Sequence, residues 1–88
     1  MLINVKCYGI YGSVLGDSME VELCDRDGVN ELLEILEQKI FQAEPEAPPL
    51  MERGKPLVKL LINGVVANLN TPLQDGDSLK LLPVIGGG

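Results

Sequence analysis

Only one segment of this sequence has the periodicity of a long amphipathic helix, and that limits the architectures open to its 88 residues. Its apolar residues recur at helical spacing along a single stripe, which consists of Val29, Leu32, Leu33, Leu36 and Ile40. Gly28 is followed three residues later by Glu31, as in a capping box, so we expect the helix to begin there. It should end by residue 43, because the position before Pro45 disfavours helical backbone. One helix with one apolar stripe can cover one face of one sheet.

The other apolar residues follow strand periodicity. Alternating or β-rich stretches occur at 1–8, 19–24, 58–62, 65–66 and 78–82. Glycines indicate a turn at 9–16 that joins the first two strands, Asn63-Gly64 predicts a tight hairpin, and the proline-rich residues 42–57 predict a surface loop. The order strand, strand, helix, strand, strand, strand predicts an α+β fold of the β-grasp type. In it, a mixed sheet of four or five strands packs on one main helix, and the last strand lies parallel to the first.

Composition excludes several classes of function. With 13 acidic and 7 basic residues, the chain is not expected to bind nucleic acid, because phosphate backbones are bound by clustered Lys and Arg. It has no histidine, the most frequent general base and metal ligand. No apolar run approaches the roughly 20 residues of a membrane-spanning helix, and no signal-peptide pattern opens the chain. We therefore expect a cytoplasmic protein that binds no metal or cofactor and is not a self-contained enzyme.

The two cysteines are too few for a four-ligand zinc site and are expected to remain free thiols. Cys7 falls on the apolar face of the first strand, and Cys24 falls on the polar face of the second. Side chains on opposite faces of a sheet cannot form a disulfide, and free thiols are typical of a reducing compartment. Either thiol could carry a persulfide, but small core or sheet residues are the simpler interpretation.

Charge is distributed unevenly along the chain. Residues 17–52 contain 11 acids and 2 bases, whereas the remainder contains 2 acids and 5 bases. We therefore expect one acidic flank and one neutral-to-basic flank. The acidic flank is interpreted first as a solvated surface that favours solubility, and second as a surface for a basic partner.

The last three positions are all glycine: Gly86, Gly87 and Gly88. We divide the chain into a domain at 1–83 and a glycine-rich tail at 84–88. Glycine has the largest backbone freedom, so the run is either a frayed end or a thread narrow enough to enter a channel in another protein. The group at its tip, the Gly88 carboxylate, is ionised at neutral pH and reacts only after activation. Because the chain has no Gly-Lys-Thr/Ser phosphate loop, a partner would have to activate it.

Several short motifs in the second half resemble those of one family. They are Asn63-Gly64, Thr71-Pro72-Leu73, Asp75-Gly76-Asp77, Leu81-Leu82-Pro83 and the Gly87-Gly88 end. Together they resemble the ubiquitin-fold sulfur carriers, the β-grasp family that includes the molybdopterin synthase small subunit and the thiamin-pathway sulfur carrier. The strands and helix of the first half have the same order. The resemblance covers nearly the whole chain except 42–57.

This resemblance implies that the chain carries sulfur and is itself a substrate. A ubiquitin-activating-type adenylyltransferase would adenylate Gly88 with ATP, and a sulfur donor protein would supply the sulfur of a thiocarboxylate. In molybdopterin synthase, the tail enters the large subunit, which holds the catalytic side chains, and donates sulfur for the dithiolene that binds molybdenum or tungsten. The chain would be the non-catalytic small subunit, with Gly86 and Gly87 in the partner's tunnel.

Three apolar residues are candidates for a partner interface. Tyr8 and Leu82 lie on the otherwise polar faces of the first and last strands, which the β-grasp fold places side by side. Val66 falls at a position that contributes to the same contact surface in the family. Exposed apolar residues on a small acidic domain indicate an interface, although single apolar residues also occur on ordinary surfaces.

Other functions stay open at this point. A thiamin-type sulfur carrier would use the same thiocarboxylate in another pathway. A ubiquitin-like modifier would share the adenylate, but its Gly88 would form an isopeptide bond with a lysine of a target. A plain interaction module would carry the glycine tail incidentally.

Overall fold

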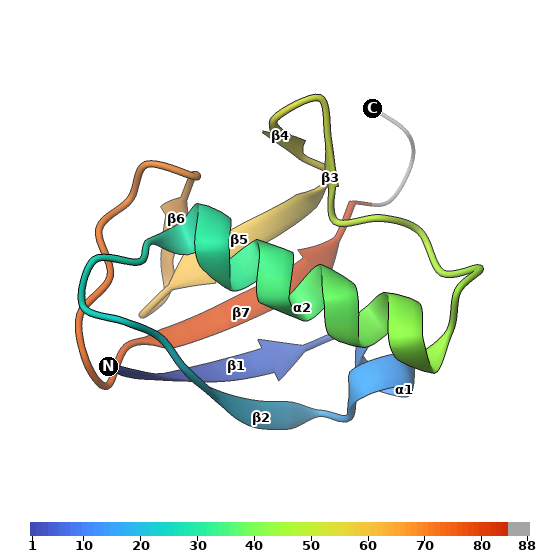
Figure 1. Cartoon of the computed structure of the whole chain (residues 1–88), viewed down its shortest axis with the longest axis horizontal. Helices are drawn as coiled ribbons and strands as arrows, with labels where there is room; N and C mark the ends of the chain where they lie inside the picture. The colour runs from blue at the N-terminus through green and yellow to red at the C-terminus, as the bar shows by residue number, and fades with distance from the viewer. Residues whose placement is uncertain (85–88) are drawn as a thin grey trace.

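The computed structural model describes residues 1–84 and shows a sheet with a long helix across one face (Figure 1). The helices are α1 (Ile10–Leu15) and α2 (Val29–Ala43). The strands are β1 (Leu2–Cys7), β2 (Ser18–Glu22), β3 (Met51–Glu52), β4 (Lys55–Pro56), β5 (Val58–Ile62), β6 (Val65–Ala67) and β7 (Ser78–Pro83). The predicted α+β class and β-grasp arrangement are confirmed.

Five strands form the main sheet, in the order β2-β1-β7-β5-β6. Neighbouring strands are antiparallel except β1 and β7, which run parallel, with Val5 opposite Leu79 and Cys7 opposite Leu81. A parallel pair needs a long crossover connection, and α2 lies within that connection. The first and last strands therefore lie side by side, as predicted, and the sheet has five strands rather than four.

The core lies between α2 and the sheet. Its helix side consists of the predicted apolar stripe, Val29, Leu32, Leu33, Leu36 and Ile40. Its sheet side consists mainly of alternate residues of the three central strands, Ile3, Val5, Cys7, Val58, Leu60, Ile62, Leu79 and Leu81. Removing each such aliphatic side chain from water stabilises the fold by roughly 1.5–3 kcal/mol, so this interface dominates the stability of the domain.

Both ends of α2 agree with the sequence-based prediction. The Gly28 N–H donates to Oε1 of Glu31 at 2.7 Å. This hydrogen bond lowers the pKa of the Glu31 carboxyl below its ordinary value, and a negative charge at this end also suits the helix dipole. At the other end, the Glu44 N–H donates to the carbonyl oxygen of Ile40 at 2.7 Å.

The prediction of a simple turn at 9–16 is wrong, because residues 10–15 form α1. Gly9 and Gly16 flank this helix with φ angles of 63° and 94°. Tyr11 explains why a helix forms here, since its side chain is only 4% exposed and joins the core. Burial raises the pKa of the Tyr11 hydroxyl, and the Glu37 carboxylate raises it further. β1 and β2 are antiparallel neighbours as predicted, but they are connected through α1.

The prediction of a plain surface loop at 42–57 is also incomplete. Leu50 is fully buried, so this segment contributes to the core. β3 and β4 form a separate two-stranded antiparallel ribbon, with Glu52 opposite Lys55. Arg53 and Gly54 make its turn, with φ angles of 52° and 76°. A proline is compatible with so short a strand, because few ladder hydrogen bonds are required of it.

The Asp75-Gly76-Asp77 turn fixes the start of β7 against β1. The Leu2 N–H donates to Oδ1 of Asp75 at 2.7 Å, and the Gly76 N–H donates to the Leu2 carbonyl at 2.8 Å. The Asn4 N–H donates to the Asp77 carbonyl at 2.9 Å. These three bonds set the register in which β7 joins β1.

The Asp77 carboxylate connects this turn to the β5–β6 hairpin. It accepts the Gln74 N–H at 2.8 Å and the side-chain amide of Asn63 at 2.9 Å. The Asn63 side chain accepts the Ser78 N–H at 3.0 Å. Asn63 and Gly64 have φ angles of 51° and 85°, as the predicted two-residue hairpin requires.

Replacing Asp77 with alanine tests this connection. Asp77→Ala removes two hydrogen bonds to a carboxylate, and we expect the free energy of unfolding to fall by about 1–3 kcal/mol in denaturant titrations. Asp17→Ala is the matched control, because Asp17 is exposed and surface substitutions change stability by about 0.5 kcal/mol or less. Equal effects of the two substitutions would contradict the role given to Asp77.

Candidate functional site

β7 brings the chain to the start of its C-terminal tail. The predicted tail glycines, Gly86, Gly87 and Gly88, lie outside the described residues. Leu82 and Pro83, immediately before the tail, are half-buried, and Val84, the first residue of the tail, is 56% exposed. The sheet therefore holds the chain as far as Pro83, and Val84 lies at the surface.

Gly9 lies directly against Pro83. It has a φ angle of 63°, and a Cβ atom at this position would lie 2.7 Å from Cγ of Pro83. Both the backbone conformation and this contact require glycine. Gly9 was predicted only as part of the turn at 9–16, because no local pattern in the sequence connects it with Pro83. The contact fixes the end of β7 against the junction of β1 and α1.

The predicted interface residues Tyr8 and Leu82 are neighbours on the face of the sheet opposite α2, which we call the open face. Lys6 lies opposite Lys80, and Tyr8 and Leu82 are each two residues further along the same strand direction. The Tyr8 N–H donates to the Leu81 carbonyl at 3.1 Å, which continues the parallel pairing past the end of β1. Tyr8 is 40% exposed and Leu82 is half-buried.

Val66 lies on β6 at the far edge of the open face. It is 68% exposed, and its register partner is Leu61 of β5. β5 separates β6 from β7, so half-buried Leu61 lies between Val66 and the strand that carries Leu82. Leu61 was not predicted as an interface residue. The alternation of inward and outward residues through 58–62 would have placed Leu61 on the open face.

Three of the chain's seven basic residues share the open face: Lys6, Lys59 and Lys80. Lys6 and Lys80 are direct neighbours across β1 and β7, and Lys59 is the partner of Leu82 across β5 and β7. Like charges on neighbouring strands are unfavourable unless other groups compensate them. The open face also carries Glu20 and Glu22, at its β2 edge. The part formed by β1, β7 and β5 therefore suits a partner surface that places carboxylates around an apolar centre.

The cysteines are free, as predicted. Cys7 is buried, and burial raises the pKa of its thiol, so it is a core residue rather than a nucleophile. Cys24 is exposed. Within residues 1–84, no cluster of three or more His, Cys, Asp or Glu side chains could hold a metal ion. No helix in the same range has the length and apolar character needed to cross a membrane.

Among solved structures, this chain is similar to an archaeal protein. The solution structure of the HVO 2177 protein from Haloferax volcanii has a TM-score of 0.82 and 26% sequence identity. The match covers 100% of this chain and 87% of that one. No curated protein matches the sequence.

Two further structures share the fold at lower identity. SAMP1 from Haloferax volcanii has a TM-score of 0.74 and 24% identity, with 100% of both chains covered. A chain from the complex of subunits 1 and 2 of the molybdopterin-converting factor from Helicobacter pylori has a TM-score of 0.61 and 24% identity, again with 100% of both chains covered. Residues 5–88 match the ThiS family. Because this match spans nearly the whole sequence, the chain belongs to the ThiS family and has its ubiquitin-like sulfur-carrier fold.

Proposed function

We propose that the chain carries sulfur as a thiocarboxylate on Gly88 and serves as the small, non-catalytic subunit of molybdopterin synthase. The observation that carries this proposal is the ThiS-family match over residues 5–88, which extends to the glycine end. The position of Pro83 supports it, because the sheet releases the chain beside the open face. A sulfur carrier needs its tail to leave the domain next to its docking surface, because the partner that binds the domain must also receive the tail.

The chemistry follows from the low reactivity of a carboxylate. One oxygen of the Gly88 carboxylate attacks the α-phosphorus of ATP, and pyrophosphate leaves, which gives an acyl adenylate. A hydrosulfide-level sulfur nucleophile delivered by a sulfur donor protein then attacks the acyl carbon. The bond to the AMP oxygen breaks and AMP leaves, so the products are a thiocarboxylate and AMP. The adenylyltransferase supplies the nucleotide site, and this chain supplies the carboxylate.

The open face supports docking of a larger partner. Tyr8, Leu82, Leu61 and Val66 provide its apolar residues, and Lys6, Lys59 and Lys80 provide positive charge among them. The Helicobacter pylori protein forms a complex of subunits 1 and 2. By analogy, we propose that a molybdopterin synthase large subunit is the second subunit for this chain and binds its open face.

The similarity to SAMP1, a small archaeal modifier protein, favours a second candidate function. A ubiquitin-like modifier would form the same adenylate at Gly88, but the amine of a target lysine would replace AMP. A thiamin-type carrier would form the same thiocarboxylate and deliver its sulfur to another acceptor. The three functions differ only in the group that attacks after adenylation or in the acceptor of the sulfur.

Adding a side chain at Gly87 or Gly88 tests whether the tail requires glycine at these positions. We expect Gly87→Val and Gly88→Val to reduce ATP–pyrophosphate exchange by the adenylyltransferase of the same host on the order of a hundredfold or more, because the tail can no longer align its carboxylate. The melting temperature should remain that of the wild type, since a terminal tail contributes little to the fold.

Ile85→Val is the matched control for these tail variants. It removes one methylene from a residue that already has a side chain, so exchange should persist. Wild-type exchange rates for Gly88→Val would contradict the proposed role of the tail.

Substitutions on the open face test the docking surface. We expect Tyr8→Ala, Leu82→Ala and Val66→Ala each to weaken binding to the large subunit about tenfold in calorimetric titrations, because each removes apolar contact area from the interface. Val65→Ala is the matched control. Val65 is as exposed as Val66, at 68%, but pairs with the core residue Ile62 and therefore belongs to the other face of the sheet. Equal losses for Val65→Ala and Val66→Ala would contradict the assignment of the open face.

A further inference from the structure

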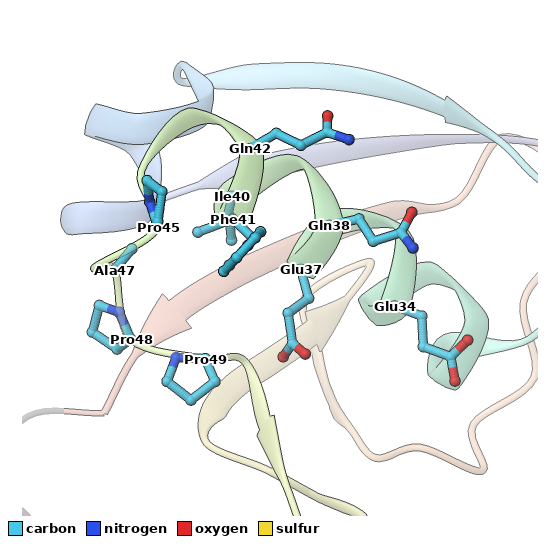
Figure 2. Close-up of a pocket in the computed structure, with 10 residues that line it drawn as sticks. All are labelled: Glu34, Glu37, Gln38, Ile40, Phe41, Gln42, Pro45, Ala47, Pro48 and Pro49. Atoms are coloured by element: carbon cyan, nitrogen blue, oxygen red, sulfur yellow. The ribbon is translucent and has the colours of Figure 1, made fainter.

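A second uncovered apolar surface lies on the helix side of the molecule. It is a groove of about 840 Å³ between the second half of α2 and the proline-rich loop that follows it. We call it the Phe41 groove, and it is lined by residues between Glu34 and Gln42 of α2 and between Pro45 and Pro49 of the loop. Figure 2 shows Phe41 and Glu37 extending from the helix towards this loop, along which the three prolines lie.

Glu37 holds the two walls of the groove together. Its Oε2 atom accepts the N–H groups of Leu50 and Met51 at 2.8 and 3.1 Å, and the Leu50 side chain is fully buried. Just after α2, the Ala47 N–H donates to the Glu44 carbonyl at 3.0 Å, which closes a turn within the loop. The loop therefore continues from α2 at one end, where it closes a turn on itself, and is hydrogen-bonded to α2 through Glu37 at the other. A preformed groove of this kind binds a partner at a lower cost in conformational entropy than a mobile loop would.

The floor of the groove exposes an aromatic residue to water. Phe41 is the only phenylalanine of the chain and is 64% exposed, while Ile40 beside it is buried in the core. Pro45, Pro48 and Pro49 are also exposed and apolar. Because Phe41 remains so accessible, the groove cannot enclose a small molecule as ligand pockets do, but it can receive a side chain from another protein.

Carboxylates dominate the charge around this apolar floor. Glu34 and Glu37 line the groove, and Glu44 and Glu46 belong to the segment that forms its loop wall. Residues 29–49 contain five acidic residues and one basic residue, Lys39, which is not among the lining residues. An approaching cationic segment would be attracted here, and an acidic segment would be repelled.

We propose that the Phe41 groove is a docking site for a basic protein segment with at least one large apolar side chain. The apolar side chain packs on Phe41 and the prolines, and the Lys or Arg side chains of the segment pair with Glu34 and the neighbouring carboxylates. The groove and the open face lie on opposite sides of the sheet. One partner can therefore occupy the groove while another occupies the open face, and this inference does not depend on the chemistry of the tail.

A second copy of this chain is the less suitable occupant. Each copy carries a formal net charge of −6, so its approach to an acidic groove is opposed by the overall charge of both molecules. Self-association through the groove can be measured by sedimentation.

Selection from a displayed library of random 12-residue peptides tests the proposal without assuming a partner. The wild-type domain is the target, and the Phe41→Ser variant is the counter-target, since Phe41 is exposed and its loss should not affect folding. We expect the enriched peptides to have a net positive charge and a large apolar residue. The same peptides should shift the NMR signals of residues 34–51 and leave those of the open face unchanged.

Binding of one enriched peptide is then measured against matched variants. Phe41→Ser and Glu34→Gln should each weaken it about tenfold, higher salt should weaken it further, and Tyr8→Ala on the open face should have no effect. The proposal is wrong if the selection yields only acidic or uncharged peptides, yields none whose binding depends on Phe41, or yields peptides that bind the open face. It is also wrong if sedimentation shows a dimer of the wild type that Phe41→Ser abolishes, because the occupant would then be a second copy.

Discussion

The parallel pairing of β1 with β7 lies inside the sheet and joins the two ends of the domain. It places Tyr8 beside the strand that carries Leu82, and it brings Lys6 next to Lys80 on the open face. The Asp75-Gly76-Asp77 turn sets the register of this pairing, and the contact between Gly9 and Pro83 fixes its other end. A shift of one residue would turn the apolar side chains of β7 away from α2 and would also move the start of the tail. The same pairing thus determines the core, the docking surface and the exit of the chain.

The sequence was sufficient for the parts of the fold that repeat a local period. The stripe of α2 and the alternation in β1 and β7 bury the residues that these periods predict, and the β-grasp order follows from them. α1 could not be predicted in the same way, because its six residues are too few to show a period and Tyr11 is its single buried anchor. Leu50 and the Gly9–Pro83 contact were missed for a related reason. Each depends on packing against residues distant in the sequence, so neither leaves a local pattern.

The distribution of charge divides the molecule into two different surfaces. The β1, β7 and β5 part of the open face combines lysines with apolar residues, whereas α2 and the loop after it combine carboxylates with exposed Phe41. The sheet and the core separate these surfaces, so substitutions on one should leave the other intact. The proposed function would bring the chain to an activating enzyme, a sulfur donor and an acceptor in turn, and surfaces that can be occupied independently suit such a sequence of partners.

Whether Gly88 carries sulfur can be read from the chemical form of the C-terminus in the native host. Cleavage after Lys80 releases residues 81–88, a peptide with neither methionine nor cysteine. Replacing one oxygen by sulfur has nearly the same mass effect as adding one oxygen, and the absence of these residues prevents oxidation from imitating it. We expect mass spectrometry of this peptide to show that one oxygen of the Gly88 carboxylate has been replaced by sulfur. Two results in cells that make the molybdenum or tungsten cofactor would contradict the proposed function. One is a terminus that carries only an ordinary carboxylate, and the other is a terminus that occurs only joined to target lysines.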